Sequence, residues 1–206
     1  MAKSKSSNLW LQEHHSDEFV KQAQREGYRG RAVYKLQELD QRYHLFGSRV
    51  SVVDLGAAPG SWSEYAARKI GSGGCILATD ILPMDAIADV EYIQGDFRED
   101  DVLEVILKTL GSRPVDLVMS DMAPNMSGVG AVDIPRAMYL AELAQDLASQ
   151  ILSPGGNFLV KLFQGEGFDE YVRNLRDSYK TVIIRKPKAS RPRSREMYAL
   201  AQGYKL

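Results

Sequence analysis

The sequence predicts a single α/β domain, a Rossmann-like, doubly wound sheet of seven strands that is mostly parallel, with one antiparallel strand. From residue 50 onward, apolar β-branched runs alternate with amphipathic helical segments, which is the pattern of a parallel sheet with helices on both faces. The first run, 50–55, stops at Gly56, and the small residues 56–60 lead directly into a helical segment. The chain closes with two strands joined by a loop without a helix, which favours one antiparallel strand.

Two helical segments are expected before the sheet. Residues 1–10 are small and polar with two lysines, and we expect them to be disordered. A helix is predicted over 11–24, with Ser16 or Asp17 as its cap, and a second over 31–43, where apolar side chains recur on one stripe. Residues 11–49 are therefore predicted to form an N-terminal helical extension of the same domain, and the glycines and basic residues of the turn at 27–31 suit contact with a polyanion.

The remaining elements follow from the alternation of apolar runs and amphipathic segments. No internal repeat or linker divides the chain, so residues 1–206 are predicted to be one domain. Pro154, Gly155 and Gly156 should form a turn that leads into the fifth strand. Strands are predicted at 50–55, 75–79, 90–94, 115–120, 157–162, 181–184 and 197–201, and helices at 61–70, 100–109, 134–151 and 168–177.

Composition indicates a soluble protein of a reducing compartment. Apolar residues make up 44% and charged residues 26% of the chain, and no run of about 18 apolar residues could span a membrane. No apolar segment follows the N-terminal lysines, so we expect no secretory signal. The single cysteine, Cys75, lies in a predicted strand and excludes an internal disulfide. We expect a cytoplasmic protein that binds no metal, since His14 and His15 point to different faces of a helix.

The net charge of −1 conceals an uneven distribution of charge. Residues 1–50 carry 9 basic and 6 acidic side chains, residues 51–179 carry 9 and 20, and residues 180–206 carry 8 and 1. Basic ends around an acidic centre predict that a polyanion binds through both ends of the chain. The alternative is that these are only solvated termini. The basic residues near the C-terminus adjoin another apolar strand, which favours the first interpretation.

Polar residues follow the strands at the edge where ligands bind in a doubly wound sheet. A tight, glycine-containing turn such as 56–60 also lets backbone N–H groups approach a ligand closely. A single member of this set, such as Asp80 or Asp96, could also be a helix cap, but the whole set predicts a site. The set comprises Asp54, Gly56, Gly60, Asp80, Asp96, Phe97, Asp121 and Lys161.

The turn at 56–60 distinguishes two classes of nucleoside cofactor. A dinucleotide-binding loop needs a glycine where this chain has Ala58, because the pyrophosphate must approach the backbone there. Asp80 is placed to accept the hydroxyls of an adenosine ribose, while Asp96 and Phe97 suit an adenine ring. The acidic surroundings, Asp54 included, favour a cationic nucleoside without phosphates, S-adenosyl-L-methionine. An NAD-dependent oxidoreductase on a similar sheet is the rival hypothesis.

Lys161 indicates chemistry at the same edge of the sheet. It ends a buried strand, where an unpaired ammonium group is costly, and Asp121 on the neighbouring strand could pair with it. Lys35 and Glu196 are further candidates, although Lys35 considered alone is more often a surface lysine of a helix.

The motifs together resemble those of the FtsJ-like RNA ribose 2′-O-methyltransferases. The resemblance covers residues from about 25 to 204, and five motifs occurring jointly make it specific. The matching segments are VYKL at 33–36, DLGAAPGSW at 54–62, SDMAPN at 120–125, GGNFLVK at 155–161, and KPKASR at 186–191 followed by SRE at 194–196.

The resemblance implies a catalytic tetrad and a set of cofactor contacts. The tetrad falls on Lys35, Asp121, Lys161 and Glu196, and the contacts to S-adenosyl-L-methionine fall on Gly60, Trp62, Asp80, Asp96 and Asp121. Lys161 is then expected either to remove the proton of the ribose 2′-hydroxyl or to orient that hydroxyl.

The resemblance also implies the substrate, a uridine ribose in the A-loop of 23S ribosomal RNA, within the 50S subunit or its precursor. We expect a monomer that acts without a metal or a membrane. A non-catalytic RNA-binding assembly factor on the same fold is the alternative. Phosphates are expected to contact Lys3, Lys5, Arg25, Arg29, Arg31 and the arc Arg185, Lys186, Lys188, Arg191, Arg193 and Arg195, with Tyr28 or Tyr34 stacking on a base.

Overall fold

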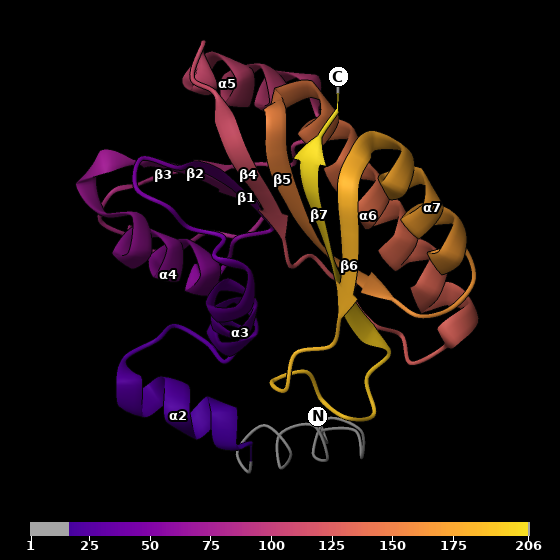
Figure 1. The fold of residues 1–206 in the computed structure, drawn as a ribbon. Coiled ribbons are helices and arrows are strands. Elements are labelled where there is room, and N and C mark those ends of the chain that lie inside the picture. Colours follow the sequence, from indigo (N-terminus) through magenta and orange to yellow (C-terminus); the bar gives the residue numbers. More distant parts are fainter. Residues whose placement is uncertain (1–16, 206) are drawn as a thin grey trace.

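The computed structural model describes residues 17–205 and shows one seven-stranded sheet (Figure 1). The strands follow the spatial order β3-β2-β1-β4-β5-β7-β6, and β7 runs antiparallel to both of its neighbours. The predicted fold class, including the single antiparallel strand, is confirmed. The strands are β1 (Ser51–Leu55), β2 (Cys75–Asp80), β3 (Val90–Gln94), β4 (Val115–Ser120), β5 (Leu152–Phe163), β6 (Tyr179–Arg185) and β7 (Glu196–Tyr204).

Every helix predicted within the described residues is present. Asp17 caps the first of them, because its side chain accepts a hydrogen bond from the Phe19 amide, while Ser16 and the stretch 1–16 lie outside the described residues. The helices are α2 (Glu18–Glu26), α3 (Val33–Tyr43), α4 (Ser61–Ile70), α5 (Asp100–Leu110), α6 (Gly130–Ile151) and α7 (Phe168–Ser178), with a short 3₁₀ turn, η1 (Gly71–Gly73), that was not predicted.

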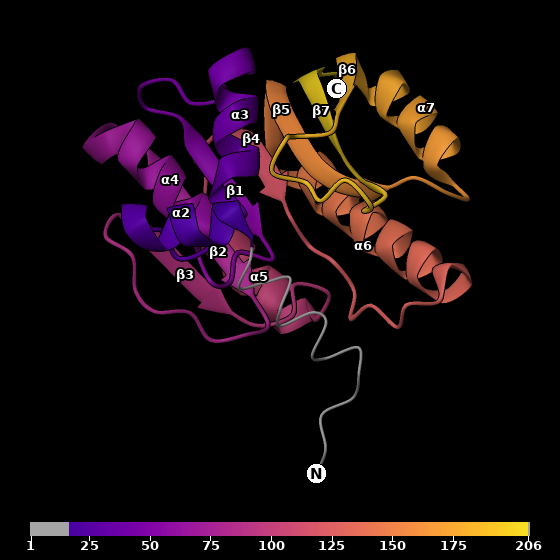
Figure 2. The same cartoon turned by 90° about the horizontal axis from the view of Figure 1, so that it is seen from below.

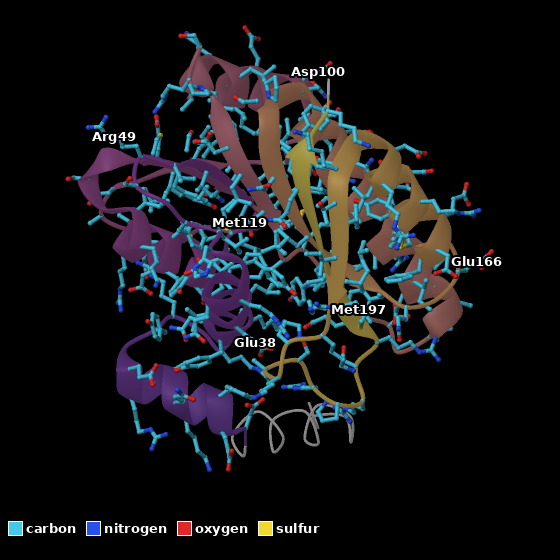
Figure 3. All side chains as sticks on the ribbon, in the orientation of Figure 1. Glu38, Arg49, Asp100, Met119, Glu166 and Met197 are labelled. Carbon is cyan, nitrogen blue, oxygen red and sulfur yellow. The ribbon has the colours of Figure 1, made fainter. Side chains whose placement is uncertain are left out.

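The helices cover both faces of the sheet in two layers (Figure 1). Along β1, Val52 packs with the cluster that includes α3 and α4, whereas Val53 packs with the cluster that includes α5, α6 and α7. Successive side chains of a strand point to opposite faces, so an apolar run of this kind fills two cores at once. Figure 3 places Met119 of β4 among the packed side chains of the interior.

The topology brings functional residues to one edge of the sheet. The strand order reverses between β1 and β4, so a crevice opens at the carboxyl ends of these two strands. Because β7 is antiparallel, its first residues lie beside the last residues of β5. Glu196 pairs with Phe163, and Tyr198 pairs with Lys161. The beginning of the last strand thus reaches the same edge as the ends of the parallel strands.

Among the described residues, the predicted starts of β5 and α6 were the most in error, and the other boundaries differ by up to three residues. The fifth strand begins at Leu152 rather than at residue 157, because residues 153–156 form an irregularity in the register opposite β4 instead of a separate turn. Gly155 permits this with a left-handed φ of 86°. Helix α6 begins at Gly130 rather than 134, and its Pro135 lies in the second turn, where the missing N–H removes one helical hydrogen bond.

The two basic ends of the sequence meet in space. The β6–β7 loop, residues 186–195, reaches toward α2 and α3 in both views of the ribbon (Figures 1 and 2). Glu38 of α3, labelled beside this loop in Figure 3, accepts a hydrogen bond from the Lys188 amide at 2.7 Å. Arg31 donates to the Ala189 carbonyl oxygen and pairs with Asp17. Within residues 17–205, no helix is long and apolar enough to cross a membrane.

Candidate active site

Asp121 and Lys161 lie on neighbouring strands at the centre of the site. Asp121 directly follows β4, and Lys161 projects from β5 two residues before its end. The Lys161 Nζ atom is 3.0 Å from Asp121 Oδ1 and also donates to the Asp121 backbone carbonyl oxygen at 2.5 Å. The two side chains are only 7% and 17% exposed, so this ion pair is largely shielded from water.

Lys35 and Glu196 form a second ion pair beside the first. Lys35 reaches the sheet edge from α3, and its Nζ atom lies 2.8 Å from Glu196 Oε1. Ser190 of the β6–β7 loop donates to the same carboxylate oxygen at 2.7 Å. The structure therefore brings together the four residues predicted as a tetrad, although they come from four separate segments of the chain. Their catalytic role stays a prediction.

Tyr198 joins the two ion pairs, and the sequence analysis missed it. Its hydroxyl accepts from Lys35 Nζ at 3.0 Å and donates to Asp121 Oδ1 at 2.5 Å. The sequence did hold a signal. In an antiparallel strand that opens with Glu196 at the site, the residue two positions later points to the same face.

The five residues Lys35, Asp121, Lys161, Glu196 and Tyr198 form an ionic cluster, and this cluster determines the protonation state of Asp121 and Tyr198. Burial acts to raise the pKa of the Asp121 carboxyl, but the charges of Lys161 and Lys35 and the Tyr198 hydrogen bond outweigh burial, so the pKa lies below its ordinary value. The pKa of the Tyr198 hydroxyl is raised well above its ordinary value, first by burial and then by the Asp121 and Glu196 carboxylates. Asp121 is thus an anion, and Tyr198 keeps its proton.

A pocket of about 820 Å³ opens on one side of the cluster. Its walls hold three of the four tetrad residues, Lys35, Lys161 and Glu196, together with apolar side chains and arginines. The arginines are Arg31, Arg191, Arg193 and Arg195, and the apolar residues include Ala123, Met126, Ile134 and Phe163. A pocket with this lining suits a ligand that combines anionic groups with an apolar ring.

A second pocket, of about 540 Å³, opens on the other side of Asp121. Gly56, Asp80, Asp96, Phe97 and Asp121 line it, as the sequence predicted for the cofactor site. An apolar wall that was not predicted follows Asp80, where Ile81 and Leu82 are 64% and 58% exposed. An apolar pair directly after a strand end, with no partner to bury it, was the available signal.

The glycine turn closes on itself, which differs from the expectation that its amides face a ligand. Gly56 and Ala57 donate their N–H groups to the Thr79 carbonyl oxygen, Gly60 donates to the Ala57 carbonyl oxygen, and Ala58 donates to the Asp80 carboxylate at 2.9 Å. The turn therefore offers no set of open amides for a pyrophosphate. Glycine is still required at Gly56, because a Cβ there would lie 2.2 Å from Met122 Cγ at a φ of 74°.

Three predicted cofactor residues are not part of the walls of the second pocket. Asp54 is 1% exposed and accepts from Ser63 Oγ at 2.6 Å. Trp62 is 3% exposed and donates from its indole nitrogen to the Ala32 carbonyl oxygen at 2.9 Å. Gly60 caps α4 with a φ of 103°. Cofactor contact by these residues stays a prediction.

Two carboxylates in the wall of the second pocket already have protein partners. The two oxygens of Asp80 accept from the Ala58 and Leu82 amides at 2.9 and 2.8 Å, and each oxygen keeps a further lone pair for a ligand. Asp96 is held by the Arg98 guanidinium, chiefly through hydrogen bonds, which lowers the pKa of its carboxyl. A ligand that uses Asp96 must share it with an arginine that is 46% exposed.

Several residues expected to contact RNA have partners within the protein. Arg29 donates to the carbonyl oxygens of Pro59, Asp85 and Ala86 at 3.2, 2.8 and 2.9 Å, which ties the turn before α3 to the cofactor side. Tyr34 is 6% exposed and donates to Glu26, so its ring is covered. Tyr28 is half-buried under Arg68.

Most of the remaining RNA candidates within the described residues lie on or beside the β6–β7 loop. Arg185 donates to the Tyr43 hydroxyl, and Lys186 donates to the carbonyl oxygens of Pro192 and Ser194. Lys188 and Arg195 are exposed, as is Arg25 on α2, whereas Lys3 and Lys5 lie outside the described residues. No group of three His, Cys, Asp or Glu side chains between residues 17 and 205 is placed to hold a metal ion.

The chain matches known proteins along nearly its whole length. The sequence profile of the FtsJ-like methyltransferases matches residues 28–204. A protein of Legionella pneumophila (strain Corby), named ribosomal RNA large subunit methyltransferase E, is 58% identical over 206 residues, which is 100% of both chains. A protein of the same name from Chromohalobacter salexigens is 60% identical over 201 residues, covering 98% of this chain and 96% of that one.

A solved structure agrees with these sequence matches. It belongs to a Plasmodium falciparum protein described as a ribosomal RNA methyltransferase. The TM-score is 0.77 at 26% sequence identity, and the match covers 86% of this chain and 98% of the other.

Proposed function

The chain belongs to the FtsJ-like methyltransferase family, and we propose that it transfers a methyl group from S-adenosyl-L-methionine to a ribose 2′-hydroxyl of large-subunit ribosomal RNA. The relatives are named for methylation of this RNA and cover the full chain, which supports the substrate class. The finer proposal is a uridine of the A-loop in 23S ribosomal RNA, presented by the 50S subunit or its precursor to a cytoplasmic monomer.

One observation carries the proposal: two pockets meet at a pair of charged residues. Lys161 lines the larger, basic pocket, Asp121 lines the smaller, acidic one, and their side chains are joined at 3.0 Å. Ala123 lines both pockets. A transfer reaction needs donor and acceptor to meet end to end, and this arrangement supplies a chamber for each.

The smaller pocket fits S-adenosyl-L-methionine better than a dinucleotide. The amides of its glycine turn are used within the protein, so a pyrophosphate would find few donors, whereas carboxylates suit a cationic ligand. We propose that Asp80 accepts the ribose hydroxyls, that Asp96 and Phe97 hold the adenine, and that Asp121 faces the methionine part. When bound, this cofactor supplies an electrophilic methyl group on a sulfonium.

We propose that Lys161 acts on the attacking hydroxyl. In its neutral form, the amine donates its two hydrogens to the Asp121 carboxylate and carbonyl oxygens, which leaves its lone pair to take the hydroxyl proton. With the cofactor bound, the ribose oxygen would take the methyl group while Lys161 accepts the hydroxyl proton, and S-adenosyl-L-homocysteine would leave with the electron pair of the carbon–sulfur bond. Asp121 holds the Lys161 amine in place, and the positive charge of Lys35 offsets part of the negative charge of Asp121 and Glu196.

Methyl incorporation into the natural particle tests this function. Large subunits from a strain that lacks this activity are incubated with the purified chain and labelled S-adenosyl-L-methionine, and the modified nucleotide is mapped. We expect a single 2′-O-methyl group on a uridine of the A-loop. Lys161→Ala should lower turnover by about a hundredfold or more while the variant still binds the cofactor.

Lys180→Ala is the matched control, because this exposed lysine of β6 lies outside both pockets, and it should keep full activity. Near-normal turnover by Lys161→Ala would contradict the role given to that lysine. Binding of the subunit without any methyl incorporation by the unaltered chain would instead favour the assembly factor.

A further inference from the structure

Tyr198 lies at the centre of the ionic cluster but cannot touch the substrate. Its side chain is 0% exposed, and its ring packs against Trp62 with the centroids 5.8 Å apart. Neither pocket has it in its lining. Any effect of this tyrosine on the reaction must therefore pass through the groups that its hydroxyl contacts.

The hydroxyl has a defined direction in the cluster. An ionised carboxylate only accepts hydrogen bonds, so the single Tyr198 proton points to Asp121 Oδ1 at 2.5 Å, and the oxygen accepts from Lys35 Nζ at 3.0 Å. Lys35 Nζ is 3.9 Å from Asp121 Oδ1, beyond direct hydrogen-bond distance. The hydroxyl is thus the hydrogen-bonded link between the Lys35–Glu196 pair and the Asp121–Lys161 pair.

We propose that Tyr198 is a positioning residue for methyl transfer, which fixes the Asp121 carboxylate and, through it, the Lys161 amine. This inference rests on the proposed function. A lysine has a long flexible side chain, and Asp121 stands on a loop, so neither holds its own position. The tyrosine ring is rigid and locked between β5 and α4, through its register with Lys161 and its contact with Trp62.

The test removes only the hydroxyl. Tyr198→Phe keeps the ring, and we expect kcat for methylation of undermodified large subunits to fall about tenfold to a hundredfold, since a misplaced reactive group loses that much. The KM for the subunits and the Kd for S-adenosyl-L-methionine should change less than about twofold, because both pockets keep their walls. This split separates positioning from a general loss of structure.

Tyr204→Phe is the matched control. Tyr204 lies on the same strand, and its hydroxyl donates to the Ser149 carbonyl oxygen, remote from the site, so this variant should keep the kcat of the unaltered chain. If the unaltered chain itself fails to transfer methyl groups, the proposed function fails. If the unaltered chain transfers methyl groups and the kcat of Tyr198→Phe is within twofold of its kcat, the positioning role of Tyr198 is overturned.

If Tyr198→Phe loses both kcat and affinity for the subunits or the cofactor, the positioning role is overturned and a structural role for Tyr198 is favoured. Should Tyr198→Phe fail to fold, 3-fluorotyrosine placed at position 198 keeps the hydroxyl and makes it a stronger donor. We then expect kcat to change more than about twofold with the KM unaltered. An unchanged kcat in that folded protein would reject the proposal.

Discussion

At the scale of single residues, Asp54 is the carboxyl group most perturbed by its surroundings. It stands at 1% exposure in β1, and burial raises its pKa to about 7, against the lowering effect of the Ser63 hydrogen bond and with added repulsion from Asp121 and Asp80. Between about pH 4 and pH 7 the folded protein therefore holds a proton on Asp54 that the unfolded chain has lost. Folding stability attributable to Asp54 is present below the ordinary pKa and declines as the pH rises toward about 7.

Asp54→Asn removes this dependence while keeping an oxygen that can accept from Ser63. Relative to the unaltered chain, the variant should gain free energy of unfolding between about pH 4 and pH 7, about 4 kcal/mol in total, and should gain little more above that range. Denaturant titrations at several pH values measure this difference. Asp177→Asn, an exposed change on α7, should show a flat difference. A flat difference for Asp54→Asn would show that its carboxyl is ionised in the fold.

Single residues also show where prediction from sequence stops. Asp121 and Lys161 were found because a charge at the end of a buried strand needs a partner, and the sheet edge supplies one. Tyr198 was missed because a tyrosine in an apolar strand normally belongs to the core, and its ring does lie there. The antiparallel register places Tyr198 opposite Lys161, and only this register brings its hydroxyl within hydrogen-bond distance of Asp121 and Lys35.

At the scale of elements, we propose that the β6–β7 loop contributes most to RNA binding. The amide of Lys188 bonds to Glu38, and the side chain of Arg31 bonds to the Ala189 carbonyl oxygen, so α3 and the turn before it hold the loop against the rim of the larger pocket. Sequence counting predicted two separate basic ends. The number of basic residues does not reveal which of them bind other parts of the protein. Arg29, for example, donates hydrogen bonds to three backbone carbonyl oxygens, and such bonds depend on the folded backbone.

Two exposed side chains of this loop should act through charge alone. Replacing Lys188 and Arg195 together by alanine should weaken binding of an A-loop RNA fragment, and should lower the slope of log affinity against log salt by about 1.4, since each lost phosphate contact to a single strand removes about 0.7. Anisotropy titrations at several salt concentrations measure both quantities. Lys108→Ala on α5, outside both pockets, should leave affinity and slope unchanged. An unaltered slope in the double variant would place the phosphates elsewhere.

At the scale of the whole molecule, the fold was predictable because apolar strands and amphipathic helices alternate over most of the sequence. Alternating strands and helices dictate a parallel sheet with two helical layers, and the two cores on either side of β1 follow from that. The boundaries at β5 and α6 were less predictable, since an irregular register or an early helical turn changes few side-chain contacts. The closed glycine turn was also invisible in sequence, because its amides are satisfied by Thr79 and Asp80 from the next strand.

The closed turn leads to a prediction about the molecule as a unit. A ligand that binds only the folded protein stabilises it by mass action, and at a hundred times its Kd this amounts to about 2.7 kcal/mol, or about 5–10 °C in Tm for a domain of this size. S-adenosyl-L-methionine should produce such a shift in a thermal scan. NAD at the same concentration should produce none, because its pyrophosphate would face carboxylates and backbone amides that are already hydrogen-bonded within the protein. Asp80→Ala should abolish most of the shift by removing the carboxylate at the end of β2, while Asp177→Asn should retain it. An equal shift with NAD would restore the oxidoreductase hypothesis for the pocket.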